Sequence, residues 1–231
     1  MCISFSPDGQ QLATAGDDRK VRVWDLQGQL LIGWEVHQAD SLVTSISFSP
    51  DGQRLATAVD NGKICLWDLQ GKPLVTFKAH GNYAWSVSFS PDGQRLATAG
   101  DESKACLWNV QGQLLVTLKG HTGSVRSVSF SADGQRLATA GNDGTARLWD
   151  LQGQQLALWG DRTSRFWSVS LSPDGQLLAT AGTDGNVRWW QIESFDDLMQ
   201  RGCDCLRDYL KNPNNGLTQE DPRRYICDDI C

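Results

Sequence analysis

The chain has 231 residues, of which 40% are hydrophobic, and it carries a formal net charge of −6. An acidic chain without a basic stripe is a poor candidate for binding phosphates, so we expect no nucleic-acid partner. No apolar run approaches the ~20 residues that span a bilayer, and the opening MCISFSPDGQ lacks the basic start and apolar stretch of a signal peptide, so we expect a cytoplasmic chain without membrane insertion.

Five similar units follow one another along residues 1–192. Each begins with SFSPDGQ or a close variant and reaches a Trp nineteen residues after an anchor Phe or Leu. The anchors are Phe5, Phe48, Phe89, Phe130 and Leu171, and the tryptophans are Trp24, Trp67, Trp108, Trp149 and Trp190. The steps between successive tryptophans are 43, 41, 41 and 41 residues. A fixed period of this length indicates a repeat architecture.

Each unit contains the signals of four short strands. In the fourth unit, SVSFS alternates apolar and polar residues and predicts a first strand, and RLATA predicts a second. The tight hairpin signal Asn142-Asp143-Gly144 leads into a third strand, TARLWD, and QLALW supplies a fourth. Such a small sheet cannot bury both faces alone, but it can when stacked on neighbours around an axis.

The unit resembles the WD-repeat of β-propellers. The fourth copy has His121, a turn at 132–134, LATAG, Asp143-Gly144-Thr145 and Trp149-Asp150 in the family's order. The resemblance implies an all-β WD-repeat propeller over residues 1–192, with five four-stranded blades of which the last lacks its outer strand. Residues 193–231 are predicted to form a separate, helical C-terminal tail.

In that family, a His, a Ser or Thr, an Asp and the Trp form a buried hydrogen-bonded tetrad in each blade. The matching positions in this chain are Thr14, Asp18 and Trp24; His37, Thr57 and Trp67; His80, Thr98 and Trp108; His121, Thr139, Asp143 and Trp149; and Thr180, Asp184 and Trp190.

Only the fourth set is complete. Asn61 and Glu102 stand where the family has Asp, Arg162 stands where the fifth unit needs its His, and the His of the first unit would precede Met1. We therefore expect the first and fifth blades to be the loosest. A Thr, His and Asp together also suggest a catalytic triad, but their recurrence in almost every unit is typical of a structural network.

The ends of the array predict unpaired surfaces. After Trp190-Gln191-Ile192 the fifth unit continues as ESFDDLMQRG, which is not a strand, and no residues precede the first inner strand to replace it. Two interpretations stay open: the chain is the C-terminal part of a longer propeller, or five blades close or form an open arc whose edge the tail covers. In both cases self-association or missing blades at the open ends are expected, because an uncovered edge tends to associate.

Residues 194–211 predict a helix with Ser194 as its N-cap, and residues 218–230 predict a shorter second one. This tail resembles the helical segment that follows WD-repeat arrays in many cyanobacterial proteins, including signalling NTPases. The C-x-C spacing of Cys203 and Cys205 on a helix points the thiols about 200° apart, unlike a zinc knuckle, so we expect no metal. The seven cysteines of the chain are expected to be mostly free thiols.

One rim of such propellers, built by the loops that enter the first strand and join the second to the third, usually binds partners. Six and four residues before the anchors, the third to fifth units have aromatic and basic side chains of the kinds enriched at binding hot spots. The candidate partner-binding residues are Tyr83, Trp85, Arg126, Arg165 and Trp167. For both tryptophans the alternative is a core position between blades.

These features predict a non-enzymatic protein–protein interaction scaffold, serving as the sensor or partner-binding part of a larger signalling protein. Its partners would be other proteins or peptides. The alternative is an enzyme or a small-ligand site in the axial channel, which needs a singular cluster of titratable residues. The sequence has no P-loop, no phosphate-cradling glycine set and no metalloprotease motif, so we expect no catalytic residue and no cofactor.

Overall fold

The structure is a computed structural model that describes residues 1–36, 41–160 and 163–192. The chain divides into two units, Met1–Trp190 and Gln191–Cys231. The predicted tail helices and the tail cysteines, together with His37 and Arg162, lie outside the described residues. No helix in the described part is long and apolar enough to cross a membrane.

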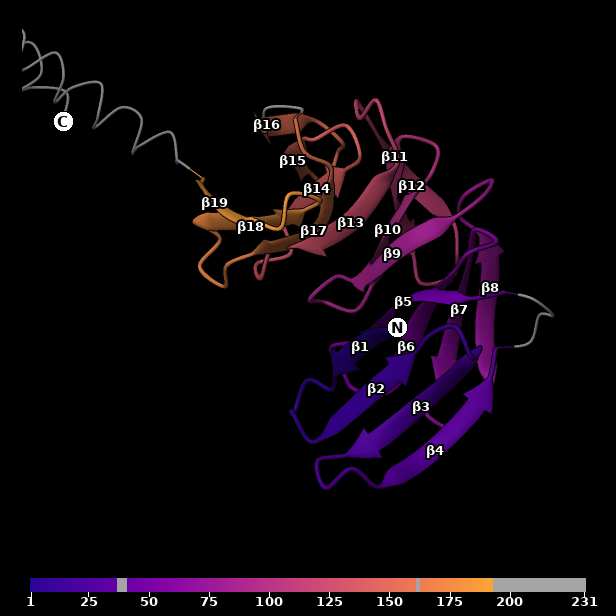
Figure 1. Cartoon of the computed structure of the whole chain (residues 1–231). Helices are drawn as coiled ribbons and strands as arrows, with labels where there is room; N and C mark the ends of the chain where they lie inside the picture. Colours follow the sequence, from indigo (N-terminus) through magenta and orange to yellow (C-terminus); the bar gives the residue numbers. More distant parts are fainter. Residues whose placement is uncertain (37–40, 161–162, 193–231) are drawn as a thin grey trace, which may run out of the picture. The chain divides into compact units, whose positions relative to one another are not determined.

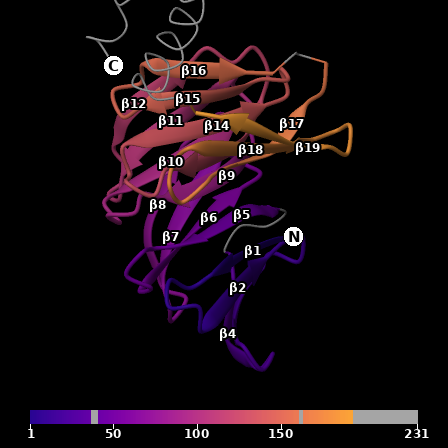
Figure 2. The same ribbon diagram turned by 90° about the vertical axis from the view of Figure 1, so that its left-hand side faces the viewer.

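The described residues of the first unit form five antiparallel sheets, one for each repeat, and the strands of each sheet pair in chain order (Figures 1 and 2). Blade 1 contains β1 (Cys2–Phe5), β2 (Gln11–Ala15), β3 (Lys20–Asp25) and β4 (Leu30–Glu35). Blade 2 contains β5 (Val43–Phe48), β6 (Arg54–Val59), β7 (Lys63–Asp68) and β8 (Pro73–Lys78). Blade 3 contains β9 (Ala84–Phe89), β10 (Arg95–Gly100), β11 (Lys104–Asn109) and β12 (Leu114–Lys119). Blade 4 contains β13 (Val125–Phe130), β14 (Arg136–Gly141), β15 (Ala146–Asp150) and β16 (Gln155–Trp159), and blade 5 contains β17 (Phe166–Leu171), β18 (Leu177–Gly182) and β19 (Val187–Gln191).

The turn between the first two strands sets the register of each blade. In blade 4 the Ser131 hydroxyl donates to Asp133 Oδ1 at 2.5 Å, and the Gln135 backbone N–H donates to the same oxygen at 2.9 Å. Gly134 has φ 67°, a left-handed conformation that suits glycine. The turn places Phe130 opposite Leu137 in the ladder, so the anchor position always has the same neighbours.

In blades 2 to 5, the inner strand packs on the sheet of the preceding blade. Between blades 3 and 4, Val128 and Phe130 of β13 belong to one buried cluster with Ala97, Ala99 and Leu107 of blade 3. The alanines leave room for the large side chains of the incoming strand, and both sides thereby leave water. Blades 1 and 2 and blades 2 and 3 meet through equivalent clusters, and β17 packs on β14 in the same way.

We call the anchor residue and the residue two positions before it, both on the first strand, the front face of a blade. The back face consists of two residues of the second strand and two of the third, which contact the next blade in blades 1 to 4. The front faces of blades 1 to 5 are Ile3 and Phe5; Ile46 and Phe48; Val87 and Phe89; Val128 and Phe130; and Val169 and Leu171. The back faces are Ala13, Ala15, Val21 and Val23; Ala56, Ala58, Ile64 and Leu66; Ala97, Ala99, Ala105 and Leu107; Ala138, Ala140, Ala146 and Leu148; and Ala179, Ala181, Val187 and Trp189.

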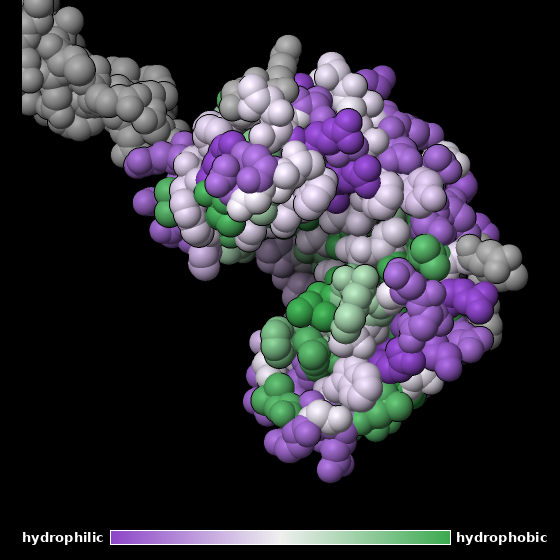
Figure 3. Space-filling view, in the orientation of Figure 1, coloured by the Kyte–Doolittle hydropathy of each residue, from purple (hydrophilic) through white to green (hydrophobic). Residues whose placement is uncertain are grey.

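The two end blades expose faces that are buried between the other blades. Phe5 on the front of blade 1 is 59% exposed, whereas Phe48 in the same position of blade 2 is 7% exposed. Trp189 on the back of blade 5 is 68% exposed, whereas Leu148 in the same position of blade 4 is 2% exposed. Figure 3 shows apolar side chains gathered over blade 1. Within the described residues the five blades thus form an open array, as the sequence predicted for a ring that lacks its closing strand.

Blade packing predicts unequal costs for one substitution at two equivalent positions. Phe130→Ala removes a buried ring and leaves a cavity against blade 3, which typically costs about 3–5 kcal/mol in the free energy of unfolding. Phe5→Ala removes a mostly exposed ring and should cost far less. An array of repeats need not unfold in two states, so the variants are best compared with the wild type by their urea midpoints rather than by a free energy of unfolding. Circular dichroism measures these midpoints. Equal shifts would contradict this account of blade packing.

Candidate functional site

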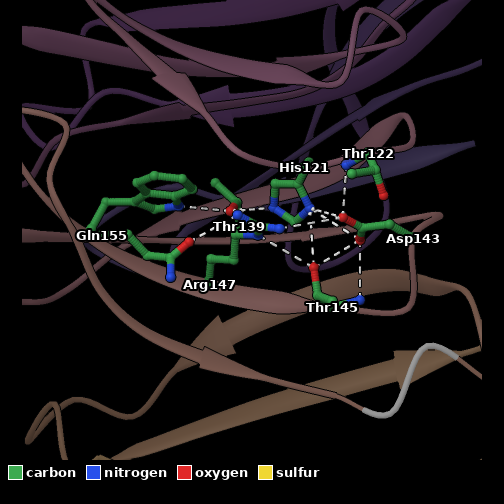
Figure 4. Close-up of polar contacts among 8 residues, drawn as sticks. His121, Thr122, Thr139, Asp143, Thr145, Arg147 and Gln155 are labelled. Carbon is green, nitrogen blue, oxygen red and sulfur yellow. Dashed lines mark hydrogen bonds and ion pairs between the residues drawn. The ribbon is translucent and has the colours of Figure 1, made fainter.

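Blade 4 contains a buried chain of hydrogen bonds that runs from its Trp to its Asp (Figure 4). Trp149 Nε1 donates to the Thr139 hydroxyl at 2.8 Å, and that hydroxyl lies 2.8 Å from His121 Nε2. His121 Nδ1 lies 2.9 Å from Asp143 Oδ2. Because the Thr hydroxyl accepts from the indole, its own proton is directed to Nε2, and the imidazole proton on Nδ1 is directed to the carboxylate.

The Asp143 carboxylate accepts further hydrogen bonds. The Thr122 N–H donates to it at 3.0 Å and the Thr145 hydroxyl at 2.8 Å, and Arg147 forms an ion pair with it at 3.8 Å. Burial alone raises the pKa of Asp143, but the hydrogen bond and charge of His121, with the donors at Thr122 and Thr145, hold that pKa well below its usual range. The network ties the hairpin after β14 to the loop that enters β13. The Thr139 hydroxyl and the His121 imidazole are buried, so the network stabilises the blade.

The Trp-to-Thr hydrogen bond occurs in every blade. The donor and acceptor atoms are 2.8 Å apart for Trp24 and Thr14, 3.0 Å for Trp67 and Thr57, 2.9 Å for Trp108 and Thr98, and 3.0 Å for Trp190 and Thr180. Each of these bonds joins the second strand of a blade to its third.

The acid position behaves differently from blade to blade. Asp18 in blade 1 pairs with Arg22 at 2.6 Å, and Asp184 in blade 5 pairs with Arg188. In blade 2 the Asn61 amide donates to the Ser41 hydroxyl at 2.9 Å. An arginine four residues along the hairpin thus binds the carboxylate in both end blades, and Arg147 stands at the same spacing from Asp143 in blade 4.

In blade 3 the acid position and the imidazole are separated. His80 Nε2 lies 2.9 Å from the Thr98 hydroxyl, but its buried Nδ1 has no hydrogen-bond partner among the described residues. Glu102, which has one methylene more than Asp, instead accepts from the Gly81 N–H at 2.8 Å and pairs with Lys104 at 2.6 Å. Burial lowers the pKa of His80 to about 4, although the charge of Glu102 opposes this.

On the rim, three of the candidate binding residues form a stack. The rings of Tyr83 and Trp85 are nearly parallel, with centroids 4.7 Å apart, and the guanidinium carbon of Arg126 lies 3.8 Å from the centre of the Trp85 ring. Tyr83 and Trp85 come from blade 3, and Arg126 comes from β13 of blade 4. Trp85 is therefore half-buried between a ring and a cation rather than sealed in the core. We call Tyr83, Trp85 and Arg126 the rim stack.

The other two candidates lie on blade 5. Arg165 is exposed, and Trp167 is 59% exposed. Burial lowers the pKa of the Arg126 guanidinium, and the positive charge of Arg165 lowers it further, while Asp101 acts in the opposite direction. The positive charge of Arg165 in blade 5 therefore repels that of Arg126 in blade 4. The structure gives Trp167 no role in the rim stack and leaves most of its indole accessible.

Two comparisons with known families agree with this geometry. A family model described as WD domain, G-beta repeat matches residues 1–25, and one described as the IFT122 first beta-propeller matches residues 34–191. The chain belongs to the WD-repeat β-propeller family. No curated protein matches its sequence. Domains of this family generally mediate protein–protein interaction and are typically non-enzymatic scaffolds.

Two rim residues of this WD-repeat chain were missed by the sequence analysis. Asp101 accepts the indole N–H of Trp85, and Asn142 accepts the Nε–H of Arg126 at 3.2 Å. Both lie sixteen residues after the side chain that they orient, at the start of the second hairpin turn. That spacing is the signal that could have found them. In blade 5 the same position is Thr183, which lacks a carboxylate to hold Trp167.

Among the described residues of the WD-repeat unit, no three His, Cys, Asp or Glu side chains gather where they could hold a metal ion. Cys2, Cys65 and Cys106 are free thiols. Burial raises the pKa of Cys65 and of Cys106, so these two thiols are protonated near neutral pH.

The unpaired imidazole of blade 3 predicts a pH dependence of stability. Because the folded state holds the pKa of His80 near 4, below the value of about 6.5 in the unfolded chain, folding favours the neutral ring. Its contribution to stability is complete above about pH 6.5 and is lost as the pH falls towards 4. His80→Gln should remove this titration, so the urea midpoint of the wild type should fall more steeply between pH 6.5 and 4.5 than that of the variant. Parallel pH profiles would contradict the assignment.

Proposed function

We propose that this chain is a non-enzymatic protein–protein interaction scaffold that binds a protein or peptide partner on the rim of blades 3 to 5. The rim stack is the observation that supports it. It places two aromatic rings and a guanidinium group in contact at the surface, where residues of these kinds dominate binding energies. The hydrogen bonds to Asp101 and Asn142 orient the stack in advance, which lowers the ordering cost of binding.

The charges and apolar surface of the rim suggest which side chains the partner presents. Arg126 and Arg165 present two positive charges that repel each other, and Trp167, two residues after Arg165, adds an exposed indole. A carboxylate matches the planar donor fork of a guanidinium group, and an apolar side chain matches the indole. We therefore propose that the partner presents an extended segment in which an acidic residue stands next to an aromatic or aliphatic one.

We also propose that the scaffold operates in the cytoplasm as the partner-binding part of a larger signalling protein. This rests on the resemblance of residues 194–211 to the helical segments of signalling proteins that carry WD-repeat arrays, and on the free thiols at the described cysteines. An aromatic and basic rim on a rigid array of blades suits such a role, because it offers a docking surface without needing chemistry of its own.

A peptide-display selection on the purified chain tests the binding surface. Selected peptides should be enriched in Asp or Glu beside an apolar residue, and fluorescence titration should give dissociation constants that rise tenfold or more for Tyr83→Ala, Arg126→Ala and Arg165→Ala. These side chains lie at the surface, so the melting temperature should change little.

Leu156→Ala is the matched control, because this exposed apolar residue lies on the outer strand β16 rather than on the rim. It should leave binding unchanged. Peptides that bind all three rim variants as tightly as the wild type would contradict the proposal.

A further inference from the structure

The exposed faces at the two ends of the array form a second surface, separate from the rim. We propose that the front face of blade 1 in one copy of the chain packs on the back face of blade 5 in a second copy, so that copies associate head to tail. The contact repeats, between two molecules, the packing that joins consecutive blades within one molecule.

The apolar residues of both faces support this arrangement. Ile3 and Phe5 are each 59% exposed, although the residues at their positions in blades 2 to 4 are buried against the preceding blade. On the back of blade 5, Val187 is 61% and Trp189 is 68% exposed. Apolar residues at these positions hold neighbouring blades together where they are buried. The front face of blade 1 therefore lacks a back face to contact, and the back face of blade 5 lacks a front face.

One hydrogen bond recurs between neighbouring blades, from a backbone N–H of one blade to a Ser hydroxyl of the preceding blade. A donor of this kind is also present in blade 1 and an acceptor in blade 5. The backbone N–H of Val87 donates to the Ser45 hydroxyl at 3.2 Å, Val128 donates to Ser86 at 3.4 Å, and Val169 donates to Ser127 at 3.1 Å. Each donor follows its acceptor by 42 residues.

In the same register, the acceptor of blade 5 is the hydroxyl of Ser168, which is exposed, and the donor of blade 1 is the backbone N–H of Ile3. Packing blade 1 of one copy on blade 5 of another would bring these two groups together. The end faces therefore match in hydrogen bonding as well as in apolar surface.

A second copy is the occupant that the structure favours, because one chain carries both halves of an interface already formed four times within it. Such a contact is heterologous: the two surfaces that meet are different, and each copy retains one free end. The wild-type chain should consequently form a concentration-dependent series of species unless the rotation between copies closes a ring.

Size-exclusion chromatography with light scattering, at several concentrations of the full chain, tests the proposal. The wild type should increase in mass with concentration. Phe5→Glu should block the front face and Trp189→Glu the back face, so each variant alone should stay at the monomer mass of 25.5 kDa. An equimolar mixture should form a dimer, because each variant retains the face that the other has lost.

Leu115→Glu is the control, since Leu115 is an exposed apolar residue on the outer strand β12 and belongs to neither face. It should associate as the wild type does, and so should the rim variants, which separates this proposal from the proposed function. Circular dichroism verifies that the variants fold, and Ile3→Lys with Val187→Lys is a second pair with the same expected behaviour.

Three results would overturn the proposal. A wild-type chain that stays monomeric at high concentration would mean that the end faces receive something other than a second copy, such as blades of a different chain. Association of Phe5→Glu alone would place the contact elsewhere. A dimer of Trp189→Glu alone would indicate two front faces in contact instead of a head-to-tail pair.

Discussion

The packing of an inner strand on the alanine-lined back of the preceding blade is the contact on which the rest of the structure depends. A sheet of four short strands has two apolar faces and too little surface to bury either by itself. Two alanines in each LATA segment create the space, and a Val or Ile with an anchor Phe or Leu fills it. Each repeat of about 41 residues supplies four strands and thereby brings the same two faces into contact again.

The hydrogen-bonded tetrads stabilise the blades in addition to the packing between them. Because the packing is retained, the residues of a tetrad can differ from blade to blade. All five blades retain the Trp-to-Thr bond, but the carboxylate is held by a His in blade 4, by arginines in blades 1 and 5, and by a backbone N–H and a Lys in blade 3. Each such bond contributes about 1 kcal/mol net. The buried apolar interfaces contribute more, so a blade can lose part of its polar network and still keep its place.

The sequence predicted the fold well because the fold consists of five repeats of one local sequence pattern. The strand signals and the turns at Asp133-Gly134 and its equivalents follow from short-range chemistry, and the structure confirms them. Whether blade 5 has a fourth strand depends on residues after 192, which lie outside the described part. The tail helices lie outside the described residues and stay a prediction.

The rim was harder to predict, because its geometry depends on residues from different repeats. That Arg126 would lie on Trp85 requires knowing how blade 4 sits on blade 3, which a single repeat does not encode. The orientation of Trp85 by Asp101 depends on a hairpin sixteen residues away, and Glu102 binds the Gly81 N–H and Lys104 instead of His80. Partner binding by the rim residues remains a prediction.

Hydrogen exchange followed by mass spectrometry, on the wild type at low concentration, tests most directly whether blades owe their stability to their neighbours. The second strands are well matched for this purpose: β10 and β14 both read RLATAG, and β18 reads LLATAG. Their unfolded chains should therefore exchange at similar rates. The account predicts slow exchange in β10 and β14, which have blades on both sides, and faster exchange in β18 and β2 at the ends of the array. Equal protection in all four strands would contradict it.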